Sequence, residues 1–217
     1  KFWIAGFANA FYSAAMSLVL ASMPFFVKYT LHLADSQSTI LFASVLLIAI
    51  GCVAVWAWLV RKFSLIPVWR AALIALAIAF IPLYFANSLP TAIVGSVLVG
   101  FGFAGVITTM DLIAAKVMDE DTAKHNVRRE GIISNALGFM NRLNGLFTSA
   151  AFSLVFLLYG YESGNNPGTQ PDNAARFLLT ICPFILMLIS FGFSFLINFN
   201  KAEPQPVISQ EPPAALE

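Results

Sequence analysis

Charge is scarce in this sequence. Only 11% of its 217 residues are Asp, Glu, Lys or Arg, whereas about 25% is usual for a soluble domain. Hydrophobic residues make up 59% of the chain and the mean hydropathy is +0.81, which excludes a water-soluble globule. Four stretches of at least 24 residues contain no charged residue, namely 2–27, 36–60, 71–110 and 177–200. The composition therefore predicts an integral membrane protein.

Cysteine and histidine are also rare, and their positions exclude several kinds of site. Cys52 and Cys182 both fall within hydrophobic stretches, so we interpret them as packing residues rather than a disulfide. His32 and His125 lie in loops predicted on opposite sides of the membrane, which excludes a shared metal site. The sequence offers no nucleophile with a base, no metal cluster and no nucleotide loop, so we expect no enzyme and no cofactor. The basic residues form no stripe, so we expect no nucleic-acid partner.

Hydrophobic length predicts the number of membrane crossings. Each crossing needs about 20 apolar residues, and a turn-like segment at 87–90, Asn-Ser-Leu-Pro, divides the longest run into two. The expected fold class is an all-α membrane protein with six transmembrane helices in a domain covering 1–200. We expect the Pro-rich segment 201–217 to be a disordered cytoplasmic tail. The predicted spans are 2–26, 39–60, 66–85, 91–115, 132–159 and 175–197.

Basic residues near the span ends predict the orientation, because Lys and Arg are retained on the cytoplasmic side. With the first residue inside, nine basic residues fall inside and two outside. Both ends of the chain are therefore expected in the cytoplasm, with the chain in a cell (inner) membrane. The inside set is Lys1, Arg61, Lys62, Arg70, Lys116, Lys124, Arg128, Arg129 and Lys201; the outside set is Lys28 and Arg176.

The fifth span carries an unusual polar face. Small and polar residues recur there at helical steps of three and four, which predicts that they share one side of a continuous helix. Lipid is excluded as their neighbour, because unpaired polar groups are costly in hydrocarbon. The face serves either hydrogen bonding between helices or a water-filled cavity. Its members are Ser134, Gly138, Asn141, Gly145 and Thr148, with Asn135, Arg142 and Ser149 in a second seam beside them.

Arg142 is the leading candidate for a functional residue. It lies ten residues beyond Ile132, or about 15 Å along a helix, which is near the bilayer midplane. A cation at that depth is costly unless it is paired or hydrated. Either Arg142 meets a substrate, an anionic partner or water in a cavity, or it belongs to a structural ion pair.

Other spans offer weaker candidates. Asp111 is the only acid within a span, and it either pairs with Arg142 or is hydrated from the cytoplasm. In the first span, Asn9 and Tyr12 form a polar stripe with Ser13 and Ser17, which suits either a hydroxylated ligand or hydrogen bonds between helices. Two further groups have simpler interpretations: Gly95, Gly100, Gly102 and Gly105 as sites of helix packing or bending, and Trp56, Trp58 and Trp69 as residues of the inner interface.

The segment between spans four and five carries a family resemblance. Residues 115–120 read AKVMDE and residues 128–132 read RREGI. This segment resembles the loop between helices ten and eleven of the glycoside-pentoside-hexuronide:cation symporters, the melibiose-carrier branch of the major facilitator superfamily. That family tends to show Ala-Asp-x-x-Asp-Tyr, then Arg-x-Glu-Gly-Ile, and a basic residue in helix eleven, where Arg142 falls. Lys116 and Glu120 depart from the pattern, standing where Asp and Tyr are usual.

The resemblance implies a function and a partner. The six spans would be helices seven to twelve, and the partner would be the N-terminal six-helix half of the same carrier. The implied activity is symport of a sugar or glycoside with Na⁺ or H⁺ by alternating access. Cavity residues would be Arg142, Asn141, Gly138, Asn135, Asn9 and Tyr12. Residues of a cytoplasmic gate would be Asp119, Arg128, Glu130, Asp111 and Lys116.

Two other functions stay open from the sequence. The first is a carrier of a lysolipid or another amphiphile, because 21 Phe residues could line an apolar path. The second is a membrane scaffold without transport activity, for which Arg142 would form a buried structural ion pair.

Overall fold

Hydrophobic runs separated by short connections become six helices that are long and apolar enough to cross a membrane. The computed structural model describes residues 2–125, 130–161 and 168–197, and the six candidate spans lie within these ranges. The described part of the chain contains helices and connections but no strands. The elements are α1 (Phe2–Phe25), η1 (Phe26–Thr30), η2 (Asp35–Gln37), α2 (Ser38–Phe63), α3 (Leu65–Tyr84), α4 (Leu89–His125), α5 (Glu130–Asn141), α6 (Asn144–Tyr159), α7 (Pro171–Arg176), η3 (Phe177–Ile181) and α8 (Cys182–Phe195).

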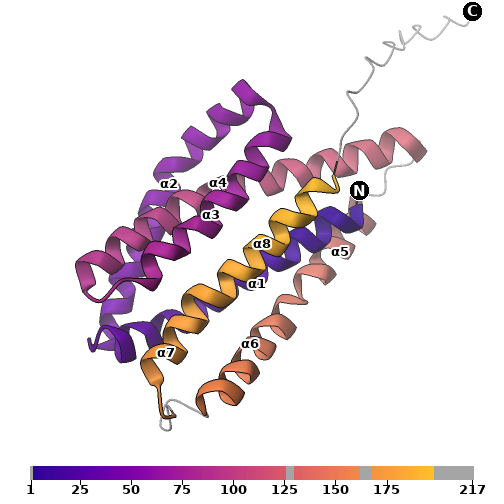
Figure 1. Ribbon diagram of the computed structural model, residues 1–217. Helices are drawn as coiled ribbons and strands as arrows, with labels where there is room; N and C mark the ends of the chain where they lie inside the picture. The colour runs from indigo at the N-terminus through magenta and orange to yellow at the C-terminus, as the bar shows by residue number, and fades with distance from the viewer. Residues whose placement is uncertain (1, 126–129, 162–167, 198–217) are drawn as a thin grey trace, which may run out of the picture.

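The helices form two groups joined through α1 and α8. On one side α4 packs against both α2 and α3, and on the other side α5 and α6 lie along α1 (Figure 1). The pair α1 and α8 lies between them, with α8 also contacting α3. The predicted six-helix fold class is confirmed. The predicted tail, 201–217, lies outside the described residues.

The helix α4 is longer than predicted. The sequence placed its end near residue 115, with a charged loop to follow, whereas the helix continues to His125. Ala, Lys, Glu and Met have high helix propensity, and an exposed helix satisfies its own backbone in water as well as in lipid. The onset of charge near residue 116 therefore does not mark the end of the helix.

Close packing explains the glycines of α4. A Cβ atom on Gly102 would lie 2.6 Å from the Cα atom of Leu76 in α3. A Cβ atom on Gly100 would lie 2.5 Å from the carbonyl oxygen of Val45 in α2. Of the two interpretations that the sequence left open, the structure supports packing, because α4 is one unbroken helix across these positions.

Two of the three tryptophans predicted at the membrane interface are core residues. Trp56 is only 4% exposed, and its indole N–H donates to the Phe101 carbonyl at 2.9 Å. Trp69 is fully buried, whereas Trp58 is exposed as expected. Trp56 packs in the core because Gly105 leaves room on α4 for its ring. Cys52 and Cys182 are free, as predicted.

Two helices contain π-helical turns at the same end of the bundle. One turn, η1, follows Pro24 in the first span, and the other, η3, precedes Pro183 in the last. Proline removes a backbone donor and commonly distorts a helix, and π-turns of this kind often mark functional positions. The turn η1 extends the first span beyond residue 26, where the sequence placed its end, whereas η3 lies inside the predicted last span, 175–197.

Candidate functional site

The fifth span is broken in the middle, at Arg142 and Leu143. The Arg142 N–H donates to the Phe139 carbonyl at 3.0 Å and the Leu143 N–H to the Met140 carbonyl at 3.1 Å. These bonds reach back three residues, where an α-helix reaches back four. The prediction of one continuous helix across 132–159 is therefore wrong, and the span consists of α5 and α6 joined by a tight turn.

Both arms of the broken span are hydrogen-bonded to α1. The Ser13 hydroxyl donates to the Asn141 side-chain oxygen at 2.7 Å. The Asn144 side-chain N–H donates to the Ser17 hydroxyl at 3.2 Å. For Ser13 and Ser17 these contacts support the sequence interpretation of hydrogen bonding between helices. They also join Asn141, a predicted cavity residue, to a helix of the same bundle.

Arg142 points away from this seam. Its side chain is exposed, and it forms no ion pair with any residue that the structure describes. A Cβ atom on Gly138 or on Gly145 would meet nothing within 4 Å, so the surface beside Arg142 is open. The sealed structural ion pair that the sequence left possible is not formed within the described residues. The exposed small and polar residues on α5, α6 and the turn between them include Ser134, Asn135, Gly138, Arg142, Gly145 and Ser149, and the apolar side chains of Phe139 and Leu146 are exposed beside them.

A small pocket, mostly apolar but lined by two polar residues, lies on the α5 side of the break. Its volume is about 50 Å³, room for one or two water molecules, and its lining includes Asn9 of α1, Asp111 of α4 and Leu137 of α5. The structure thus brings together two of the predicted residues, Asn9 and Asp111. Asp111 is exposed and does not pair with Arg142. A hydrated carboxylate at the helix surface agrees with that placement.

Tyr12 lies in the core rather than on the open surface. It is 8% exposed, and its ring stacks on Phe103 of α4 with 6.4 Å between the ring centres. Aromatic stacking of this kind stabilises helix packing. Tyr12 is therefore separated from the Arg142 surface by the body of α1.

The predicted gate is only partly described. Asp119 and Lys116 lie on the extension of α4, where both are exposed. Arg128 lies outside the described residues, as does the side chain of Glu130, whose backbone begins α5. The gate therefore stays a prediction.

The family model described as MFS/sugar transport protein matches residues 1–201. The chain belongs to the major facilitator superfamily. No curated protein matches the chain. Membership makes the chain a transporter of the major facilitator type, and its six apolar helices make it an integral membrane protein.

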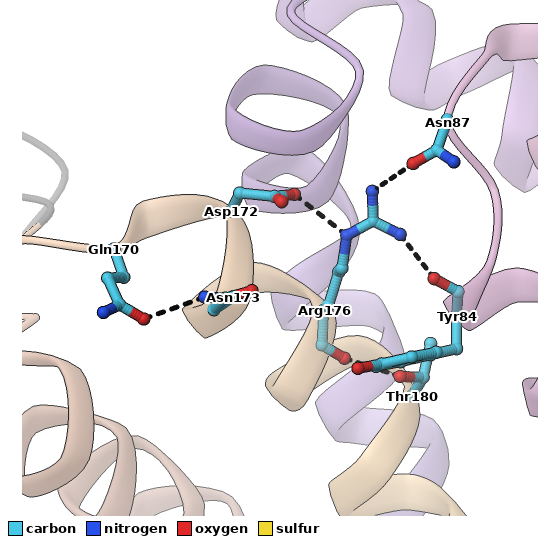
Figure 2. A network of polar contacts seen from close by, with 7 residues as sticks. All are labelled: Tyr84, Asn87, Gln170, Asp172, Asn173, Arg176 and Thr180. Carbon is cyan, nitrogen blue, oxygen red and sulfur yellow. Dashed lines mark hydrogen bonds and ion pairs between the residues drawn. The ribbon is translucent and has the colours of Figure 1, made fainter.

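The major facilitator bundle has a polar junction at its α7 end that the sequence did not predict. Figure 2 shows the Arg176 guanidinium between Asp172 on its own helix and the turn between α3 and α4. Its Nε donates to Asp172 at 3.0 Å, its Nη2 donates to the Asn87 side chain at 2.6 Å, and its Nη1 donates to the Tyr84 carbonyl. The Thr180 hydroxyl donates to the Arg176 carbonyl at 2.6 Å. The spacing of Asp172 and Arg176, four residues apart, was the only signal in the sequence.

Arg70 makes a second junction, at the other end of the bundle. Its Nη2 donates to the Ser194 carbonyl at 3.1 Å and to the Ile197 carbonyl at 3.2 Å. The guanidinium also lies 4.7 Å from the ring centre of Phe195. A cation at these carbonyls complements the negative end of the α8 dipole. The sequence carries no signal for this contact, because the partners lie more than 120 residues apart.

Proposed function

We propose that this chain is the C-terminal six-helix half of a cation-coupled symporter for a sugar or glycoside, similar to the melibiose-carrier branch. One observation carries the proposal: an exposed arginine at the break of a membrane-spanning helix, on a surface where small and polar residues lie beside the exposed apolar side chains of Phe139 and Leu146. Membrane transporters place substrate sites at such breaks, near the bilayer midplane. The family match to sugar transport proteins supports the same class of substrate.

The energetics of Arg142 support a cavity on this surface. An arginine facing lipid near the midplane costs at least about 2.5 kcal/mol on insertion scales. The turn and the two glycines beside Arg142 leave the guanidinium uncovered by the described helices. The surface is therefore tolerable in a membrane only if water, a substrate or another protein segment covers it.

The coverage of the six spans favours a partner bundle on this side. Within the described residues, only 11% of the apolar part of the fifth span is buried, against 22–56% in the other five spans. We infer that the N-terminal half of the same carrier covers α5 and α6, leaving a central cavity between the halves. Alternating access then follows from movement of one half against the other.

The orientation and the coupling ion are part of this proposal. The nine-to-two excess of basic residues supports cytoplasmic ends and a location in a cell membrane. Coupling to Na⁺ or H⁺ rests on the resemblance alone. The gate is proposed to consist of charge pairs among Asp119, Arg128 and Glu130, with Lys116 and Asp111 nearby in the chain.

Substitution of Arg142 tests the proposal in the complete carrier reconstituted in liposomes. Arg142→Ala is expected to abolish coupled sugar uptake while the carrier stays in the membrane, because the side chain fills no packed core. Arg142→Lys keeps the charge but loses the planar fork, so partial uptake is expected. Arg61→Ala is a matched control, because Arg61 is an exposed cation at the end of α2.

Three outcomes would change the assignment. Full uptake by Arg142→Ala would refute the role of Arg142. Uptake of a lysolipid in place of sugars, with the same dependence on Arg142, would show that the protein is an amphiphile carrier and that Arg142 belongs to its substrate site. Absence of transport of either class by the wild type would support the scaffold.

A further inference from the structure

The break in the fifth span is flanked by two hydrogen bonds to one continuous helix. Ser13 and Ser17 lie one turn apart in α1, which is unbroken between them. Each contacts one asparagine: Ser13 bonds the last residue of α5, Asn141, and Ser17 bonds the first residue of α6, Asn144. The two arms of the broken span are thus fixed against the same helix on either side of Arg142.

The turn itself cannot fix the relative orientation of the arms firmly. Its backbone bonds reach back three residues, and such bonds have poorer geometry than those of an α-helix. The Gly145 N–H donates to the Arg142 carbonyl at 3.3 Å rather than to the carbonyl of Asn141. An external support is needed if the residue in the middle is to keep one direction.

The two asparagines determine where Arg142 points. Successive residues of a helix or tight turn are rotated by about 100–120° about its axis. Because Asn141 faces α1, its neighbour Arg142 is directed away from α1, and its side chain is exposed. Loosening either bond would let the turn rotate and would release the guanidinium from the open surface.

We propose that Ser13 and Ser17 are positioning residues, which hold the guanidinium of Arg142 toward the open surface through Asn141 and Asn144. The effect on transport rests on the proposed function, whereas the effect on the direction of residue 142 does not. Other contacts keep the helices together without the serines. The Met140 side chain lies over Gly6, and the rings of Phe11 and Phe147 contact each other at a tilt of 37°, with 4.8 Å between the ring centres.

A cysteine at position 142 reports its direction. In the complete carrier, with Cys52 and Cys182 replaced by alanine, Arg142→Cys is modified with a charged, membrane-impermeant thiosulfonate and the rate is measured. A hydrogen bond contributes about 1 kcal/mol, or a factor of about five. We expect about a fivefold lower rate with Ser13→Ala or with Ser17→Ala, and a larger decrease with both.

Matched variants separate positioning from general destabilisation. Ser22→Ala removes a buried hydroxyl from the same helix that bonds only its own backbone, to the Leu18 carbonyl at 2.6 Å, so the rate should stay unchanged. Ser13→Thr and Ser17→Thr keep the hydroxyl and should restore the rate. Equal rates in all variants, or the same decrease with Ser22→Ala, would overturn the proposal. If the double variant does not fold, the single variants decide.

Transport distinguishes this proposal from the proposed function. With Arg142 in place, the double serine variant is expected to raise KM for the sugar at least fivefold at an unchanged amount of carrier, and the threonine variants are expected to restore it. If Arg142→Ala transports normally while the labelling rates still depend on the serines, the proposed function fails and the positioning stands. If Arg142→Ala is inactive but the labelling rate at position 142 is the same with and without the serines, only the positioning proposal is refuted.

Discussion

A single methyl group added at Gly102 should destabilise the contact between α3 and α4. The Cβ atom of Gly102→Ala would lie 2.6 Å from Leu76 Cα and 2.8 Å from Leu76 N, whereas ordinary contact begins at 3.4 Å. These are backbone atoms, so no side chain can rotate away. The two helices must separate by about 0.8 Å along this direction, which loosens the neighbouring contacts as well.

The magnitude follows from two opposing effects. Overpacking of a well-packed contact costs about 1–3 kcal/mol, and the better helix propensity of alanine returns up to about 1 kcal/mol. We expect a net loss of about 1–2 kcal/mol, which corresponds to a decrease in Tm of about 2–8 °C for a chain of this size. Thermal unfolding in detergent, followed by tryptophan fluorescence, measures the shift.

Gly51→Ala provides the matched control. A Cβ atom on Gly51 would meet nothing within 4 Å, and the residue is exposed in the middle of α2. The same change of residue should therefore leave Tm unchanged or raise it slightly, since only the helix propensity changes. If Gly102→Ala unfolds at the same temperature as Gly51→Ala, the close approach of α3 and α4 described above is wrong.

Two further predictions concern the ends of the bundle. Arg176→Gln should lower the free energy of unfolding by about 2 kcal/mol, because it removes charge-assisted hydrogen bonds to the α3–α4 turn. Asp172→Asn should lower it by less than about 1 kcal/mol, because the Asp172 carboxylate is half exposed. Equal losses for both variants would refute the central role of the Arg176 guanidinium. In a background without other cysteines, Asp119→Cys should label only from the cytoplasmic side and Gln170→Cys only from outside, and the reverse pattern would overturn the proposed orientation.

The sequence predicted the number of spans well but not the interruption of the fifth. Charge-free runs indicate crossings because each charge in lipid is costly, and that rule does not depend on how helices pack. The sequence around Arg142 contains no proline, which is the usual signal of a broken helix. Asparagine is a weak helix former, but Asn141 and Asn144 become anchors only through Ser13 and Ser17, more than 120 residues away in the chain.

For the candidate site too, the sequence predicted some residues correctly and could not predict the surroundings of others. Spacing along the span was enough to single out Arg142, Gly138 and Asn135, all of which are exposed. Spacing could not separate Asn141 from them, because only the partner helix determines that its amide is bonded to α1. Likewise, nothing in the sequence distinguishes the buried ring of Tyr12 from one that lines a cavity.

The helix α4 is long enough for a small tilt to move its far end by several ångströms. The helix has 37 residues, or about 55 Å, so it extends well past a hydrocarbon layer of about 30 Å. About 30 Å of it lies beyond Gly105, where the Trp56 ring touches it. A tilt of about 10° at that fulcrum would sweep the far end through about 5 Å. A small rearrangement in the middle of the bundle would therefore produce a larger displacement at the charged surface that carries Asp119.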